Sequence, residues 1–162
     1  MRALAKLLVW WMPAAAKSRA CREVSSDFAA ALSRRLRAGG AGVDAYRAAA
    51  RETGVRAGNR LKSELGLGSS FDDAELAWQI VMKASGMKFT VERRPSRSLF
   101  RHLCCPLLAA GGAALCEDFC LPMVEGLTEA ICPSCRVEIA ERPSDERPCV
   151  KALIQSGNSN AG

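Results

Sequence analysis

Cysteine is the residue type in this chain that offers the most chemistry. The 162-residue sequence contains eight cysteines, and seven of them lie between Cys104 and Cys149. His102 is the single histidine, so a metal site would have to be built mainly from thiolates. Zinc and iron–sulfur clusters accept such ligand sets, and thiolates are also nucleophiles. The cysteines therefore predict a metal-binding or reactive-thiol role.

Two pairs of these cysteines have spacings suited to metal chelation. Cys116 and Cys120 stand four residues apart, so on a helix they share one face. Cys132 and Cys135 form a C-x-x-C motif, whose geometry lets two thiolates meet one metal ion. Together the four residues read C-x3-C-x11-C-x2-C, which is compatible with tetrahedral zinc. One interpretation is therefore a structural zinc protein with a basic interaction surface.

A different set of four cysteines stands at the ends of predicted elements. Cys105 follows a predicted strand, Cys116 and Cys120 lie on the next predicted helix, and Cys149 opens the last predicted strand. Element ends are where a fold brings distant ligands together, so these four are expected to line one site. The site would hold an iron–sulfur cluster or zinc, with the C-x-x-C pair as alternative ligands. The alternative is that each thiol is a small buried hydrophobic group.

The elements that must position these cysteines follow from the periodicity of the apolar residues. Helical spacing in the first half predicts helices over 28–37, 44–66 and 72–85. Ser70 or Asp72 can cap the third of these helices. Gly54 and Gly58, four residues apart, would lie on one helix face and permit a close contact with another helix.

After Gly86 the period changes from about four residues to two. Strands are predicted over 87–93, 98–104, 136–142 and 149–155, and they pair into two hairpins. Apolar residues 106–131 predict a helix broken near Gly111-Gly112 or at Pro122. The expected fold class is α+β, with N-terminal helices packed on a small, about four-stranded antiparallel sheet and a helix between two hairpins.

One cysteine-rich α+β domain over 25–155 is expected to account for most of the chain, because the length and the 49% hydrophobic content suit a single core. An N-terminal amphipathic helix or appendage is expected over 1–24, and a frayed tail over 156–162. Lys6 leaves the first apolar stretch short for a secretory signal. A cytoplasmic location is expected, where reducing conditions favour metal-binding or reactive thiols over disulfides.

Positive charge is concentrated in the first half of the chain. Residues 1–66 contain 13 Lys/Arg against 5 Asp/Glu, and the whole chain carries a net charge of +6. The cations are scattered and no aromatic residues interleave with them, so nucleic-acid binding by this chain alone is disfavoured. No apolar run reaches the roughly 18 residues of a membrane span.

From about Gly54 to its end the chain resembles the superfamily of 4-vinyl-reductase-like domains. The matching features are the Gly-x3-Gly helix, the strand-like GMKFTVE, Cys105-Pro106, the LCEDFC segment ending at Cys120, the strand-like RVEIAER, and Cys149 opening a final strand. The superfamily includes the sensor half of ArsR-like iron–sulfur regulators and the L-2-amino-thiazoline-4-carboxylic acid hydrolase family, and the C-x3-C element is most similar to the hydrolase branch. The chain departs from the pattern in its extra C-x-x-C motif and in lacking a Gly-Asp turn before Cys149.

The resemblance implies an α+β domain, often a homodimer, that holds a small apolar or planar ligand or a metal centre. The regulator branch would ligate its cluster with Cys105, Cys116, Cys149 and one cysteine of the C-x-x-C motif. The hydrolase branch would place Cys105, Cys116, Cys120 and Cys149 around its pocket. A cysteine-rich small-ligand or metal-binding domain is therefore the first expectation, and a hydrolase opening a thiazoline-carboxylate-like ring is the alternative.

A hydrolase of that type would act on a cyclic C–N bond and would need a nucleophile, a base and an anchor for the substrate carboxylate. The catalytic candidates in those roles are Cys120, Asp118 and His102. The substrate-binding candidates are Arg101, Phe100 and Phe119. Each has a plainer interpretation, since aromatic side chains usually fill the core and an acidic residue at a helix start complements the helix dipole.

Overall fold

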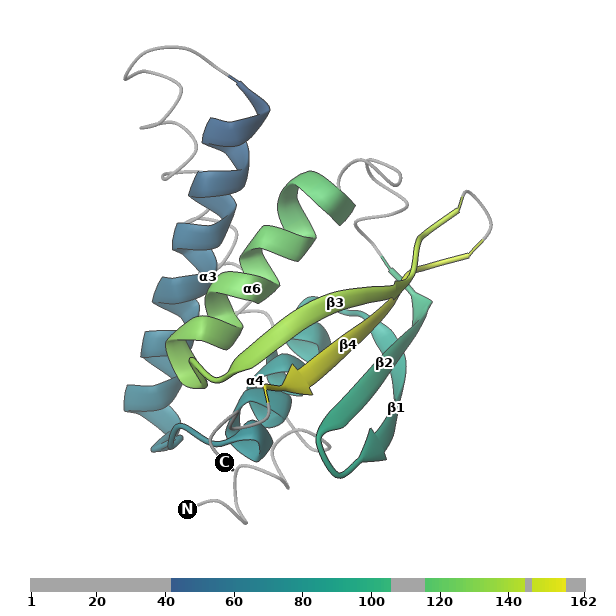
Figure 1. Cartoon of the computed structure of the whole chain (residues 1–162). Coiled ribbons are helices and arrows are strands. Elements are labelled where there is room, and N and C mark those ends of the chain that lie inside the picture. Colours follow the sequence, from purple (N-terminus) through teal and green to yellow (C-terminus); the bar gives the residue numbers. More distant parts are fainter. Residues whose placement is uncertain (1–41, 106–115, 145–146, 157–162) are drawn as a thin grey trace, which may run out of the picture.

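The computed structural model describes residues 42–105, 116–144 and 147–156, which form three layers of helix and sheet (Figure 1). In chain order the elements are α3 (Val43–Leu65), α4 (Phe71–Ala84), β1 (Lys88–Arg94), β2 (Arg97–Cys104), η1 (Cys116–Cys120), α6 (Leu121–Ile131), β3 (Cys135–Glu141) and β4 (Val150–Gln155). The α+β prediction, with helices before a four-stranded antiparallel sheet and a helix between two hairpins, is confirmed. The expected helices over 1–24 and 28–37, residues 106–115 and the end of the tail lie outside the described residues.

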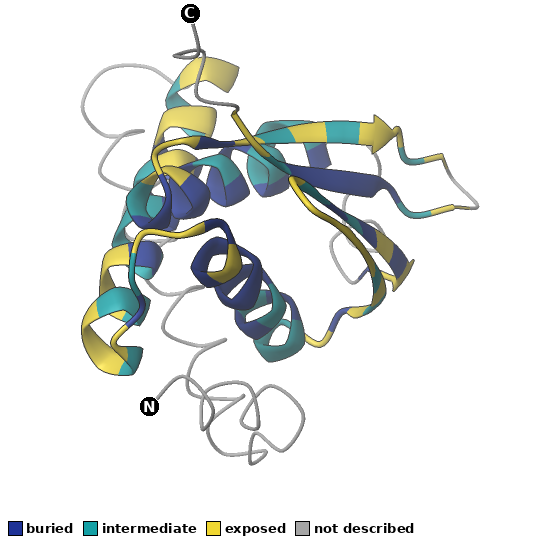
Figure 2. Cartoon of the chain, turned by 60° about the horizontal axis from the view of Figure 1, so that its bottom comes forward, coloured by how far each residue is buried: buried dark blue, intermediate teal, exposed yellow. Residues whose placement is uncertain are grey.

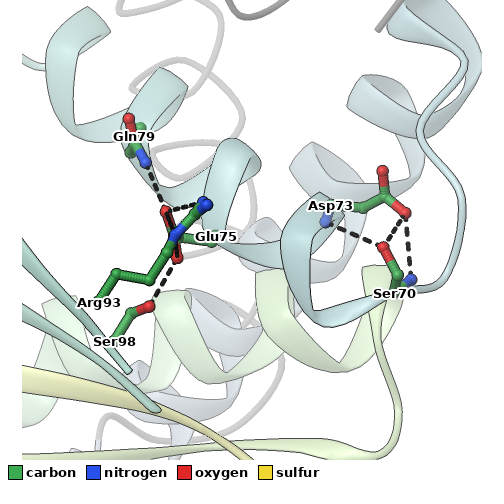
Figure 3. A network of polar contacts seen from close by, with 6 residues as sticks. All are labelled: Ser70, Asp73, Glu75, Gln79, Arg93 and Ser98. Carbon is green, nitrogen blue, oxygen red and sulfur yellow. Dashed lines mark hydrogen bonds and ion pairs between the residues drawn. The ribbon is translucent and has the colours of Figure 1, made fainter. Parts of the chain in front are cut away.

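The two helices that precede the sheet end where the sequence predicts. Helix α3 stops at Gly66, whose φ of 63° is the left-handed conformation that glycine adopts without strain. Helix α4 begins after Ser70, which forms a capping box with Asp73 (Figure 3). The Ser70 hydroxyl accepts the Asp73 backbone N–H, and the Asp73 carboxylate accepts the Ser70 N–H.

The sheet joins the two hairpins through their second strands. The strand order is β1-β2-β4-β3, and every neighbouring pair is antiparallel. Phe100 of β2 pairs with Lys151 of β4 at the centre of the sheet. Because successive side chains of a strand point to opposite faces, Ser98, Phe100 and His102 share the buried face of β2, whereas Arg101 lies on the other face.

Helices α4 and α6 cover one face of the sheet, and the core lies between them and the strands (Figure 2). The Trp78 ring of α4 lies 4.8 Å from the Phe100 ring, and the Trp78 indole N–H donates to the Thr128 hydroxyl of α6 at 2.8 Å. Trp78 and Phe100 are therefore core residues rather than the lining of an open pocket.

A buried carboxylate ties α4 to the first hairpin (Figure 3). Glu75 is 1% exposed, and its oxygens accept hydrogen bonds from Arg93 of β1 at 2.6 Å and from Ser98 of β2 at 2.6 Å. Gln79, one turn further along α4, donates to the same carboxylate at 2.9 Å. Every oxygen of this buried charge thus has a donor, which is the condition for burying it.

Helix α3 packs on α6 through glycine, as the Gly-x3-Gly spacing predicts. A Cβ atom on Gly54 would overlap the backbone carbonyl of Met123, and one on Gly126 would overlap the carbonyl of Arg51. A Cβ on Gly58 would press against the Ala130 side chain at 2.8 Å. The backbones therefore touch, and α3 forms an outer layer that holds α6 against the sheet (Figure 1).

The segment before α6 places two cysteines at the helix entry. Cys116–Cys120 forms one turn of π-helix, and the α-helix begins at Leu121, with Pro122 in its first turn. Proline is tolerated there because the first turn leaves its backbone N–H groups unpaired. The predicted break at Pro122 is therefore the start of α6, while Gly111-Gly112 lies outside the described residues.

Candidate functional site

Four cysteines predicted to line one site lie together where β2 ends and β4 begins. Cys116 Sγ lies 3.5 Å from Cys149 Sγ, and Cys120 is in hydrogen-bond contact with Cys116. Cys105 follows β2 and lies close enough to act electrostatically on Cys120. All four thiols are buried, none more than 9% exposed. The fold thus gathers sulfur atoms from η1 and from the ends of two central strands.

A lysine that sequence analysis did not single out lies inside this group. Lys151 is fully buried on β4, and its Nζ lies 2.9 Å from Cys149 Sγ. The signal was present in the sequence, because the alternation of β4 places Cys149, Lys151 and Leu153 on one face. A lysine on a buried strand face breaks the apolar pattern, and such a violation marks a special site.

The protonation states of the thiols and of Lys151 depend on one another. Burial alone would lower the pKa of Lys151, but nearby Cys120, Cys149 and Cys116 raise it above its usual value. The hydrogen bond from Cys116 and the charge of Lys151 lower the pKa of Cys120 to about 7, against the effect of burial. Lys151 is therefore a cation at neutral pH, and Cys120 is the thiol that loses its proton first.

Cys116 and Cys149 stay protonated while Cys120 is charged. Hydrogen bonding to Cys120 and burial raise the pKa of Cys116, and hydrogen bonding to Cys116 and burial raise the pKa of Cys149. The Cys120 thiolate therefore balances the Lys151 ammonium. A further thiolate would form only with another positive charge, such as a metal ion, beside it.

His102 borders the site from β2 with no hydrogen-bond partner for either ring nitrogen. It is 3% exposed, and burial together with the charge of Lys151 lowers its pKa to about 4. The ring is therefore neutral at physiological pH. A neutral imidazole does not supply the positive charge expected of a carboxylate clamp, so the structure argues against that role.

The remaining hydrolase candidates are not brought together around the thiols. Asp118 pairs with Arg47 of α3 at 2.7 Å, on the exposed side of η1. Arg101 pairs with Glu141 on the exposed face of the sheet. The other two candidates are aromatic: Phe100 is wholly within the core, and Phe119 lies against the ring of Tyr46 at 6.4 Å. These residues make structural contacts and do not surround one substrate.

The interpretation of a single C-x3-C-x11-C-x2-C zinc site is wrong. Cys116 and Cys120 precede α6, whereas Cys132 and Cys135 follow it. The helix between them has 11 residues, so the two pairs lie about 16 Å apart along its axis. One tetrahedral ion cannot span that distance, and the cysteines therefore form two separate groups.

Among the residues that the structure describes, one small cavity adjoins Cys120. A pocket lined by Cys120 and apolar side chains of α4 and α6, among them Trp78, Met82 and Met123, has a volume of about 10 Å³. That is room for one water molecule and not for a thiazoline ring. Within the described part of the chain, no group of three or more His, Cys, Asp or Glu side chains is arranged so that it could hold a metal ion.

No known protein family, curated protein or solved structure matches this chain. The resemblance to 4-vinyl-reductase-like domains therefore stays a prediction based on the motifs themselves. Among the described helices, none combines the length and the apolar character that crossing a bilayer requires.

Proposed function

We propose that the chain is a metal-binding domain whose ligands are the thiolates of Cys105, Cys116, Cys120 and Cys149. The observation that carries this proposal is the buried Lys151 ammonium, which lies 2.9 Å from Cys149 Sγ. A cation removed from water needs an anion beside it, and the groups that raise its pKa are all cysteines. Four thiolates around a divalent ion carry excess negative charge, and Lys151 would offset part of it.

The chemistry of the donor set fits a soft metal. Thiolate sulfur is the preferred ligand of zinc and of iron–sulfur clusters. The separation of 3.5 Å between Cys116 Sγ and Cys149 Sγ is close to the roughly 3.8 Å edge of a tetrahedron with zinc–sulfur bonds of about 2.3 Å. This favours a single tetrahedral ion, which Cys105 and Cys120 would complete by rotation about χ1.

Size and protonation favour a metal over an organic substrate. Within the described residues, the cavity at Cys120 has a volume of about 10 Å³ and holds nothing larger than water, whereas a metal ion requires only that thiols rotate and lose protons. Cys120, with its pKa lowered to about 7, supplies the first thiolate at neutral pH. Neither nitrogen of the His102 ring beside these thiols has a hydrogen-bond partner, so this ring is available as a further metal ligand.

Metal analysis paired with an absorption spectrum tests the proposal. Protein purified without oxygen is expected to contain about one equivalent of zinc and to be colourless. Iron with sulfide and a band at about 400 nm would instead assign an iron–sulfur cluster to the same thiols. Protein that binds neither zinc nor a reconstituted cluster would overturn the proposal.

Substitutions then assign the ligands. Cys120→Ser and Cys149→Ser are each expected to lose the metal, while Cys104→Ser, at an exposed neighbouring thiol, should retain it. Lys151→Met is expected to weaken metal affinity about 10- to 100-fold, because it removes the charge that balances the thiolates. Equal metal content in Cys104→Ser and Cys149→Ser proteins would contradict this ligand set.

A further inference from the structure

The turn between α6 and β3 brings the two remaining buried cysteines together. Cys132 caps the end of α6, Cys135 opens β3, and the Cys135 N–H donates to the Cys132 carbonyl at 2.9 Å. This bond closes a four-residue turn, which holds the two Cα atoms within about 7 Å. Disulfides require Cα atoms about 4.4–6.8 Å apart. The sulfurs themselves face each other at 2.6 Å.

The two thiols differ in their access to solvent. Cys132 is 1% exposed, whereas Cys135 is 9% exposed and lines a surface groove of about 350 Å³ between α6 and β3. Two arginines and two glutamates line the same groove, so its charges balance, and the exposed Pro133 forms part of its wall. A small molecule that enters this groove therefore meets Cys135 first, with Cys132 directly behind it.

We propose that Cys132 and Cys135 form a thiol–disulfide exchange site that becomes an intramolecular disulfide on reaction with a small disulfide of the glutathione class. The proposal is independent of the metal site, because α6 separates the two groups of cysteines. It assigns a function to the one cysteine motif that the metal site leaves unused.

The exchange is balanced in two steps. The Cys135 thiolate attacks one sulfur of glutathione disulfide, the S–S bond breaks, and the departing glutathione thiolate takes up the proton that Cys135 released. Cys132 then attacks the Cys135 sulfur of the mixed disulfide and expels the second glutathione, which takes up the Cys132 proton. Two protein thiols are oxidised to one disulfide, and one glutathione disulfide is reduced to two thiols.

The surroundings favour the disulfide once it has formed. Burial and the neighbouring Cys132 raise the pKa of Cys135, so a reduced thiolate gains no stabilisation there. Oxidising thioredoxin-like pairs owe their potential to such stabilisation of the thiolate. The turn already holds the sulfurs in contact, and little rearrangement of the backbone is needed to join them.

Peptide mapping of the full chain tests the inference directly. The metal-loaded protein is incubated with glutathione disulfide, quenched in acid, alkylated, and cleaved after glutamate. Cleavage at Glu129 and Glu138 releases a peptide of residues 130–138, in which Cys132 and Cys135 are the only cysteines. Sampling continues until the exposed Cys104 has reacted.

The expected product is a 130–138 peptide that has lost two hydrogens and carries no alkyl group. Cys132→Ser should instead leave a glutathione adduct on Cys135, and Cys135→Ser should leave Cys132 free, because Cys132 is buried. Circular dichroism of both variants checks that they fold. A peptide alkylated at both cysteines, or one that retains a glutathione adduct in the unsubstituted protein, would overturn the inference. Metal content measured on the same samples keeps this outcome distinct from that of the metal site.

Discussion

Removal of Lys151 from water would cost several kcal/mol if no anion lay beside it. The hydrogen bond from Cys116 and the charge of Lys151 lower the pKa of Cys120 to about 7. The ammonium and the thiolate therefore stabilise each other. His102 responds to the same cation in the opposite sense, and stays neutral. At the scale of single residues, the buried Lys151 charge therefore favours a charged Cys120 and a neutral His102, in addition to the effects of hydrogen bonding and burial.

His102 predicts a loss of stability in acid. Its pKa is lowered from 6.5 to about 4 by burial and by Lys151, so between these pH values the unfolded chain binds a proton that the folded chain excludes. The free energy of unfolding should therefore be greatest above pH 6.5. It should fall by about 3 kcal/mol at most as the pH drops toward 4. Urea unfolding at several pH values measures this.

His102→Gln provides the comparison, because it removes the titrating group while every carboxylate remains. The variant should show a smaller decrease between pH 6.5 and 4 than the unsubstituted protein. An identical decrease in the two proteins would show that His102 does not contribute.

Glu75 predicts a second effect at the residue scale. Glu75→Gln removes the charge that holds Arg93 and leaves a buried amide in place of an acceptor with three donors. A loss of about 1–3 kcal/mol in the free energy of unfolding is expected. Glu138→Gln is the matched control, because its ion pair with Arg136 is exposed and should contribute less than about 1 kcal/mol. Equal effects would contradict a structural role for the Glu75 network.

At the scale of elements, the contact between α3 and α6 depends on the absence of side chains. Gly54 of α3 lies against the Met123 carbonyl, and Gly126 of α6 lies against the Arg51 carbonyl. Backbone atoms cannot rotate away as a side chain can, so an added methyl group must push the helices apart. Since α6 also carries η1 at its start, a shift of this helix would move Cys116 and Cys120.

Gly54→Ala is accordingly expected to lower the free energy of unfolding by about 3 kcal/mol, despite the better helix propensity of alanine. Gly42→Ala is the control, since a Cβ there meets nothing within 4 Å and the change should stay below about 1 kcal/mol. Chemical denaturation of both variants measures the difference. Similar midpoints for the two would refute the close contact.

The elements themselves were largely predictable, because each has a local signal. Ser70 and Gly66 mark helix ends, and the alternation after Gly86 marks the strands. The same alternation also predicts that Lys151 lies on the buried face of its strand. This signal is a charged residue at an apolar position, and it is separate from the signal that assigns the strand. The prediction of a single zinc site was wrong because it considered only the spacing of the cysteines along the chain. The rigid helix α6 lies between the two pairs and keeps them apart.

At the scale of the whole molecule, α6 separates the cysteines of the proposed metal site from those of the proposed exchange site. Cys132→Ser is expected to leave metal content unchanged, and Cys149→Ser is expected to leave disulfide formation in the 130–138 peptide unchanged. Effects at sites farther apart than about 10 Å usually add, so the double variant should show both losses and no more. Metal analysis and peptide mapping of the three proteins check this. Loss of metal in Cys132→Ser would indicate coupling between the sites.

The pairing of β2 with β4 also determines when a growing polypeptide could form the proposed metal site. Cys149 directly precedes the last strand and Lys151 belongs to it, and this strand inserts between β2 and β3. A nascent chain still lacking that strand has Cys105, Cys116 and Cys120 but neither the fourth sulfur nor the ammonium. With the proposed ligand set, metal binding would therefore require that synthesis has passed β4, and a chain that ends before β4 would not bind the ion.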